Sequence, residues 1–132
     1  MKTLDFPIIR QSTVDTCSCA CVQSCLCYYG IYKREDQLRR LMRIEKHPLE
    51  VHPRKIVNAL KSFGLTATYS KLEISDVIIS IDEDEPVIIN LQAWFRSKKP
   101  DYNTDNNGHY VVAMGYDERR IIFSDPSCFY KT

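Results

Sequence analysis

The sequence predicts one α+β domain, because helical and strand patterns occupy different parts of the chain. Apolar residues recur at helical spacing in three stretches before Gly64, whereas β-branched and alternating runs dominate after Pro86. Such segregation is typical of a domain in which helices pack on an antiparallel sheet. The length of 132 residues suits a single hydrophobic core. We therefore expect one domain over residues 1–132, whose end also suits excision from a longer chain.

The first helix is expected from about Cys17 to Tyr29, because this stretch is strongly apolar. Residues 1–10 lead into it in an extended form, since Pro7 lacks a backbone donor and FPII has no helical period. Asp15 or Thr16 can cap the helix, and the glycine after it can end it. A helix of this composition is too apolar to be exposed.

Two more helices are expected before the strands begin. One covers Arg34 to Met42, and the other begins near Pro53 and ends at Gly64. Their apolar faces consist of Leu38, Leu41 and Met42 in the first, and Ile56, Val57, Leu60 and Phe63 in the second. His47 and His52 each precede a proline in the connecting loop, so we expect them on the surface.

The middle of the chain gives weaker patterns. Leu65 to Lys71 alternates as a strand would. Ser75 to Asp84 is ambiguous, because it is rich in β-branched residues but begins with a good helix cap, and we favour a helix. Pro86 to Ala93 is expected to be a buried strand. The polar stretch from Arg96 to Asn107 is a loop that could border a functional cleft.

A hairpin is predicted near the C-terminus. Gly108 to Asp117 alternates with a β period, a charged turn follows, and Ile121 to Pro126 (IIFSDP) forms the second strand. His109 lies at the start of this hairpin, and Asp125 lies at its end. Whether their side chains meet depends on the register between the two strands.

The length of the turn sets this register. A three-residue loop over Asp117 to Arg119 would pair Tyr116 with Arg120 and place His109 and Asp125 on one face as diagonal neighbours. A two-residue loop would place them on opposite faces. Because Arg119 is poorly suited to the left-handed position of a three-residue loop, a β-bulge is an alternative route to the same register.

Charge and hydropathy exclude several classes of partner. Eighteen Lys and Arg residues against seventeen Asp and Glu residues leave a net charge of +1, which provides no basic field for nucleic acid or an anionic membrane. No apolar run approaches the length of a membrane span, and the N-terminus lacks a signal-peptide pattern. We expect no nucleic acid partner and no direct membrane insertion.

Six cysteines raise the question of disulfides and metals. Five lie between Cys17 and Cys27 in one expected helix, whose neighbouring turns cannot all pair, so reduced thiols in a cytosol are favoured. Cys21 and Cys25 are best explained as small buried hydrophobic residues. A zinc site is the alternative, but the spacing C-x-C-x-C-x3-C-x-C fits no common zinc motif. We expect no metal and no cofactor.

Cys17 is the candidate nucleophile. It lies where the first helix begins, and the partial positive charge of a helix N-terminus favours the thiolate. Gln11, six residues upstream, has a side-chain amide that could donate to an oxyanion beside the same sulfur.

Both ends of the chain carry a recognisable pattern. A Gln is followed six residues later by a Cys, and an apolar helix then closes on Tyr-Tyr-Gly. The positions in register are Gln11, Cys17, Ala20, Leu26, Tyr28, Tyr29 and Gly30. Near the C-terminus, Gly-His begins a strand, Gly-Tyr-Asp ends it, and Asp-Pro closes the next strand. This pattern resembles that of the bacteriocin-processing, double-glycine leader peptidases, which are papain-like cysteine peptidases.

The resemblance implies a role for each of four residues. Cys17 would attack as a thiolate, His109 would take and return its proton, and Asp125 would hold the imidazole in one tautomer. Gln11 and nearby backbone N–H groups would form the oxyanion hole. The chain departs from the family at Ser18, where the usual Gly lets the backbone approach the substrate closely, so rate or substrate fit is the property that this residue affects.

The resemblance also implies a fold and a function. The fold would be papain-like α+β, with the site between helices and sheet, and the activity would be cleavage of a peptide or protein substrate after a Gly-Gly type pair in its leader. Members act alone or as a domain of an exporter of the ABC transporter class, which implies a cytoplasmic location or the cytoplasmic face of the membrane. Two alternatives stay open: a non-catalytic peptide-binding domain of the same fold in a secretion system, and a thioester-forming acyltransferase.

Overall fold

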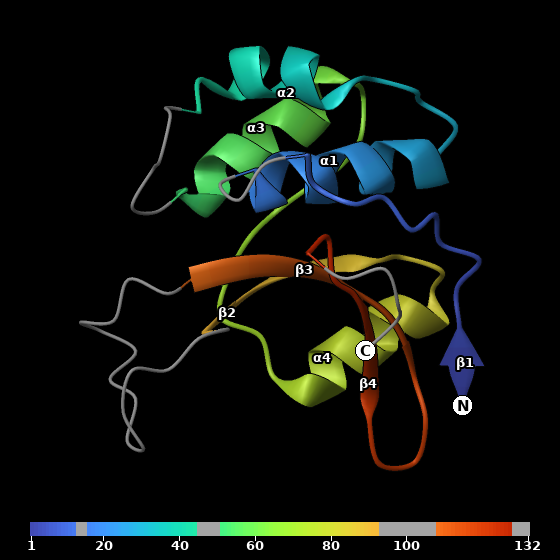
Figure 1. The fold of residues 1–132 in the computed structure, drawn as a ribbon. Coiled ribbons are helices and arrows are strands. Elements are labelled where there is room, and N and C mark those ends of the chain that lie inside the picture. Colours follow the sequence, from blue (N-terminus) through green and yellow to red (C-terminus); the bar gives the residue numbers. More distant parts are fainter. Residues whose placement is uncertain (13–15, 45–50, 93–107, 128–132) are drawn as a thin grey trace.

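A computed structural model describes residues 1–12, 16–44, 51–92 and 108–127. Its helices are α1 (Cys17–Tyr28), α2 (Glu35–Met42), α3 (Pro53–Ser62) and α4 (Ile74–Asp82). Its strands are β1 (Lys2–Thr3), β2 (Val87–Gln92), β3 (Gly108–Tyr116) and β4 (Ile121–Ser124). Figure 1 shows α1, α2 and α3 on one side of the sheet and α4 on the other. No described helix is long and apolar enough to span a bilayer.

The central strand of the antiparallel sheet is β3. It pairs with β2 through Val87↔Ala113 to Gln92↔Gly108, and with β1 and β4 through its last residues. Because β1 and β4 both pair with Gly115 and Tyr116, they occupy opposite edges of β3. The strand that carries the predicted histidine is therefore paired with other strands on both sides.

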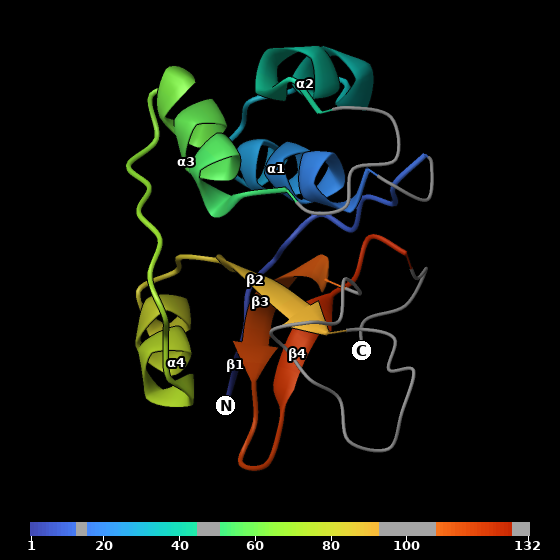
Figure 2. The ribbon, with the colours of Figure 1, turned by 90° about the vertical axis from the view of Figure 1, so that its left-hand side faces the viewer.

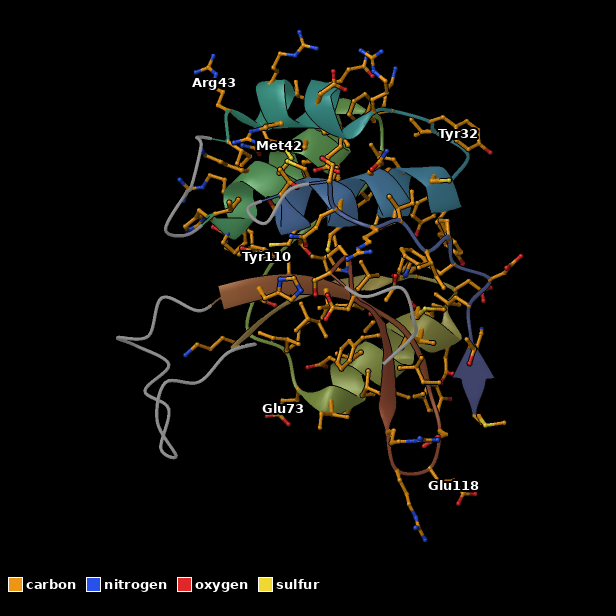
Figure 3. The ribbon with its side chains drawn as sticks, in the orientation of Figure 1. Tyr32, Met42, Arg43, Glu73, Tyr110 and Glu118 are labelled. Carbon is orange, nitrogen blue, oxygen red and sulfur yellow. The ribbon has the colours of Figure 1, made fainter. Side chains whose placement is uncertain are left out.

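The core lies between α1 and the sheet, and it also includes buried residues of α2, α3 and α4. Its fully buried large side chains include Leu26 of α1, Leu38 of α2, Ile81 of α4 and Met114 of β3. α1 is buried over most of its surface, as its apolar composition predicts. Tyr110 of β3 lies between the strand and the helices above it (Figure 3), and its hydroxyl donates to the carbonyl of Val51. The start of α1 also lies against β3, because the backbone N–H of Tyr110 contacts the Cys17 sulfur.

Most predicted elements are confirmed, with boundaries shifted by one or two residues, but β2 is half-buried and not fully buried as predicted. Gly30 and Gly64 adopt the left-handed φ values of 82° and 89° that end α1 and α3. The ambiguous stretch is the helix α4, but Glu73 occupies its cap position, and the backbone N–H of Glu73 donates to Asp76 Oδ2 at 2.9 Å. The expectation that Ser75 is the cap was therefore wrong.

The strand predicted over Leu65 to Lys71 does not form. These residues stretch from α3 to α4 (Figure 2) without a strand partner among the described residues. Leu65 and Ala67 are half-buried while Thr66 and Thr68 are exposed. An extended segment lying against the domain alternates in this way without belonging to a sheet. Leu41 was likewise misassigned to a buried face, because its side chain is exposed in α2.

Candidate active site

Cys17 is the first residue of α1, and Thr16 occupies the N-cap position. The side chain of Thr16 makes no capping hydrogen bond, so the predicted side-chain cap is not found there, and Asp15 lies outside the described residues. Cys17 is half-buried, whereas the next residues of the helix are buried. The helix start therefore presents one partly accessible thiol beside the N–H groups that no turn of helix satisfies.

His109 is the second residue of β3, and its side chain is 3% exposed. Its Nε2 atom lies 2.7 Å from Oδ1 of Asp125. With Nε2 occupied by the carboxylate, Nδ1 is the ring nitrogen left for Cys17, whose thiol is hydrogen-bonded to the His109 side chain. The structure thus brings together the three residues that the sequence pattern selected from opposite ends of the chain.

A β-bulge creates this meeting. The turn between β3 and β4 has four residues, because Tyr116 pairs with Ile121 and not with Arg120 as a three-residue loop would require. Without a correction, this turn would put Asp125 opposite Val112, on the wrong face of the sheet. The register shifts by one between Ala113 and Gly115, so Val112 pairs with Ser124 and the next residue, Asp125, comes opposite Val111. The predicted loop length was wrong, but the predicted diagonal arrangement and the bulge are both present.

Asp125 is held by the residue two positions after it. Its Oδ1 accepts from the backbone N–H of Ser127 at 2.9 Å and from the Ser127 hydroxyl at 2.7 Å. Three donors, counting the imidazole, therefore converge on one carboxylate oxygen. Sequence reasoning missed Ser127, although Asp followed two residues later by Ser is a pattern in which the carboxylate binds its own downstream backbone.

The electrostatics of the three groups favour an ion pair. Burial opposes ionisation of the Cys17 thiol, but the His109 contact and the backbone N–H groups of Tyr110 and Ser18 outweigh it and lower the pKa of Cys17. Burial likewise opposes charge on His109, but its hydrogen bonds to Cys17 and Asp125 raise the pKa of the imidazole. Burial also disfavours the Asp125 carboxylate, yet His109 and Ser127 lower its pKa. The three pKa shifts together favour a Cys17 thiolate, a His109 imidazolium and an Asp125 carboxylate.

The other cysteines of α1 have the opposite tendency. Burial raises the pKa of Cys19 to about 11 and that of Cys25 to about 12, and it raises the pKa of Cys21 well above its ordinary value. All three are buried, and the five described cysteines are free thiols. Among the described residues, no three His, Cys, Asp or Glu side chains are grouped so that they could hold a metal ion. Cys17 is thus distinguished from its neighbours by its surroundings.

Gln11 lies next to the turn that follows Asp125. Its backbone N–H donates to the carbonyl of Pro126 at 2.9 Å, so the extended lead-in meets the chain directly after Asp125. Its side-chain oxygen is buried. The lead-in therefore delivers Gln11 to the same end of the sheet as the catalytic candidates, and its role as an oxyanion donor stays a prediction.

Ser18 occupies the position at which the family usually has glycine. Its side chain is fully buried, although the sequence left open whether it would crowd the cleft in place of glycine. Its backbone N–H still contacts the Cys17 sulfur, so the donor that a glycine would supply is retained. The Ser18 side chain instead makes a hydrogen bond to the neighbouring Cys19 thiol, which opposes the effect of burial on the pKa of Cys19.

His52 is exposed, as expected, but it also has a structural role. Its Nδ1 accepts the backbone N–H of Arg54 at 3.0 Å, which caps α3. The remaining predicted surface histidine, His47, lies outside the described residues, as do Cys128 and the loop from Arg96 to Asn107.

Comparison with known proteins places this site in context. Residues 3–130 match the family model described as the Peptidase_C39 like family. The crystal structure of the peptidase domain of Streptococcus ComA, a bi-functional ABC transporter involved in a quorum-sensing pathway, is similar with a TM-score of 0.65 and 23% identity. That match covers 89% of this chain and 77% of the ComA domain.

A second solved structure, described as a C39-like peptidase from Bacillus anthracis, is similar with a TM-score of 0.80 and 19% identity. It covers 100% of this chain and 88% of that one. No curated protein sequence matches at a significant level. The two structural likenesses confirm the predicted papain-like α+β fold.

Proposed function

Because the chain belongs to the Peptidase_C39 like family, we propose that it is a cysteine peptidase with Cys17 as nucleophile, His109 as acid and base, and Asp125 as the orienting carboxylate. The observation that carries the proposal is the contact of 2.7 Å between His109 Nε2 and Asp125 Oδ1, made by an imidazole that also contacts the Cys17 thiol. A buried, paired histidine beside a cysteine of lowered pKa is the arrangement that thiol catalysis needs.

The reaction follows from the charge state of the site. The Cys17 thiolate attacks the scissile carbonyl carbon, and the carbonyl oxygen becomes an oxyanion that the Gln11 amide and the helix-start N–H groups stabilise. His109 gives its Nδ1 proton to the departing amine as the C–N bond breaks, which leaves a thioester on Cys17. His109 then takes a proton from water as the water attacks the thioester. The acyl group leaves as a carboxylic acid, and the Cys17 thiolate and His109 imidazolium are restored. Asp125 keeps its charge throughout.

The substrate class comes from the family. We propose that the enzyme cuts a leader segment from a secreted peptide precursor after a small-residue pair of the Gly-Gly type. The likeness to the peptidase domain of an ABC transporter supports an exporter as a partner and a site of action on the cytoplasmic side. The buried position of Ser18 supports unhindered access of such small residues to Cys17.

The test uses fluorogenic peptides that differ in one residue pair, Gly-Gly or Leu-Leu, with the purified chain. The proposal predicts cleavage directly after Gly-Gly, slower cleavage after Leu-Leu, and no cleavage by Cys17→Ala. Cys25→Ala is the matched control, because it removes a thiol from the same helix away from the imidazole. Full activity of Cys17→Ala would contradict the proposal.

Product analysis separates hydrolysis from acyl transfer. Mass spectrometry in the presence of a millimolar primary amine should find the free carboxylic acid as the main product. A dominant amide product would favour the acyltransferase, and binding without any product would favour the peptide-binding domain.

A further inference from the structure

A side chain that stabilises an oxyanion must be held in place before the substrate arrives. Gln11 follows an extended lead-in and is not part of a described helix or strand. Its backbone N–H is fixed to the Pro126 carbonyl, which ties it to the sheet side of the site. Cys17 belongs to the helical layer and His109 to the sheet, so a second tie to the helical layer would fix this stretch from both sides of the site.

Glu35 makes that connection through the next residue. Oε2 of Glu35 accepts the backbone N–H of Ser12 at 3.0 Å, and Oε1 accepts the Ser12 hydroxyl at 3.1 Å. Both carboxylate oxygens are used, and charge-assisted bonds of this kind are about twice as strong as neutral ones. Ser12 and Glu35 are 23 positions apart in sequence, so the contact is tertiary.

The anchor belongs to a helix that is packed in the core. Glu35 is the first residue of α2, and this helix is packed by the buried side chains of Leu38 and Met42 in the core. Glu35 is half-buried, whereas the neighbouring Asp36 is exposed and pairs with Arg34 and Arg40 on the surface. The two acidic residues of the first turn therefore face different surroundings.

From these contacts we propose that Glu35 is a positioning residue for Gln11: it holds Ser12 against α2 while Pro126 holds the Gln11 backbone, so that two consecutive residues are fixed from the two layers of the domain. This inference rests on the proposed function, because it needs Gln11 to act on a reacting carbonyl. Misplacement of a catalytic group by about 1 Å can cost about 100-fold in rate, so loss of this tie should reduce turnover while leaving the thiol intact.

The test compares Glu35→Ala with Asp36→Ala. Both remove a negative charge from the first turn of α2, so both lose the same favourable helix-terminus interaction, and only Glu35→Ala frees Ser12. We expect kcat for the Gly-Gly peptide to fall about 10- to 100-fold in Glu35→Ala with KM nearly unchanged. Asp36→Ala should keep the wild-type kcat. Glu35→Gln keeps one acceptor oxygen and should give an intermediate kcat.

A second measurement separates positioning from general damage. Alkylation of Cys17 by iodoacetamide needs the thiolate but no oxyanion hole, so Glu35→Ala should react at the wild-type rate. Equal kcat in Glu35→Ala and Asp36→Ala would overturn the inference, and so would a matching fall in the alkylation rate of Glu35→Ala. Wild-type protein that fails to cleave the peptide would instead contradict the proposed function on which the inference depends.

Discussion

Replacement of Asp125 by Asn tests how the imidazole is held. In catalytic triads, the amide replacement can cost about 10⁴-fold because its NH₂ group faces the imidazole and forces the wrong tautomer. In this protein two donors of Ser127 converge on Oδ1 of Asp125, at 2.9 Å from the backbone and 2.7 Å from the hydroxyl. An amide nitrogen at that position would meet these donors, so the amide oxygen should occupy it and still accept from His109 Nε2.

The expected loss can be worked from this geometry. Asp125→Asn replaces a charge-assisted hydrogen bond, worth about 1.5–3 kcal/mol, by a neutral one worth about 0.5–1.5 kcal/mol. The difference of about 1–2 kcal/mol corresponds to a fall of about 5- to 30-fold in kcat/KM. It also corresponds to a decrease of about one unit in the pKa of His109.

The sign of the pH effect follows from the direction of that change. Asp125 helps to raise the pKa of His109, and the active imidazolium is lost as the pH rises through that pKa. Asp125→Asn should therefore move the alkaline limb of the kcat/KM profile to lower pH, which a rate profile and an NMR titration of His109 can both measure. A loss of 10⁴-fold would refute the role given to Ser127, and an alkaline limb that does not move would refute the effect of the Asp125 charge on the pKa of His109. Asp125→Asn combined with Ser127→Ala should lose more than the sum of the single effects, because only the Ser127 backbone N–H then holds the amide oxygen in place.

Two further changes test the oxyanion site and the sheet edge. Gln11→Ala should lower kcat by about 100-fold with little change in KM, as expected for a donor used mainly in the transition state, and a rise in KM alone would instead place Gln11 in the binding cleft. Gly115→Ala should release β1, because an added Cβ would lie 2.9 Å from the Lys2 carbonyl oxygen and 3.0 Å from Thr3 Oγ1. We expect a loss of about 1–3 kcal/mol in unfolding free energy and faster hydrogen exchange at the β1 amides, with unchanged exchange at β1 as the contrary result.

The family pattern selected the candidate residues, and the periodic elements that carry Cys17 and His109 were predicted well from the sequence. Cys17 begins an apolar helix and His109 begins an alternating strand, so the local pattern specifies where each side chain can point. The prediction of a strand over Leu65 to Lys71 was wrong, because alternation indicates only an extended chain with one side covered. It does not indicate whether a partner strand is present.

The contacts that position the site were harder to predict. The register of β3 and β4 depends on a bulge whose location no single residue signals, and the expected turn length was one residue too short. The tie between Ser12 and Glu35 joins residues far apart in sequence, and either residue alone is typical of a solvated surface. Such contacts depend on how the layers pack, which local patterns do not encode.

The central claim is that Cys17 alone among these thiols is ionised and reactive near neutral pH. Sub-stoichiometric iodoacetamide at about pH 6, followed by peptide mapping, tests it, because the thiolate is the reacting species. Cys27 is the internal control, since it is half-buried like Cys17 but lies at the other end of α1. We expect Cys17 to be labelled well before all other cysteines, and we expect His109→Ala to remove most of this advantage. Uniform labelling, or labelling that starts at another cysteine, would contradict the central claim.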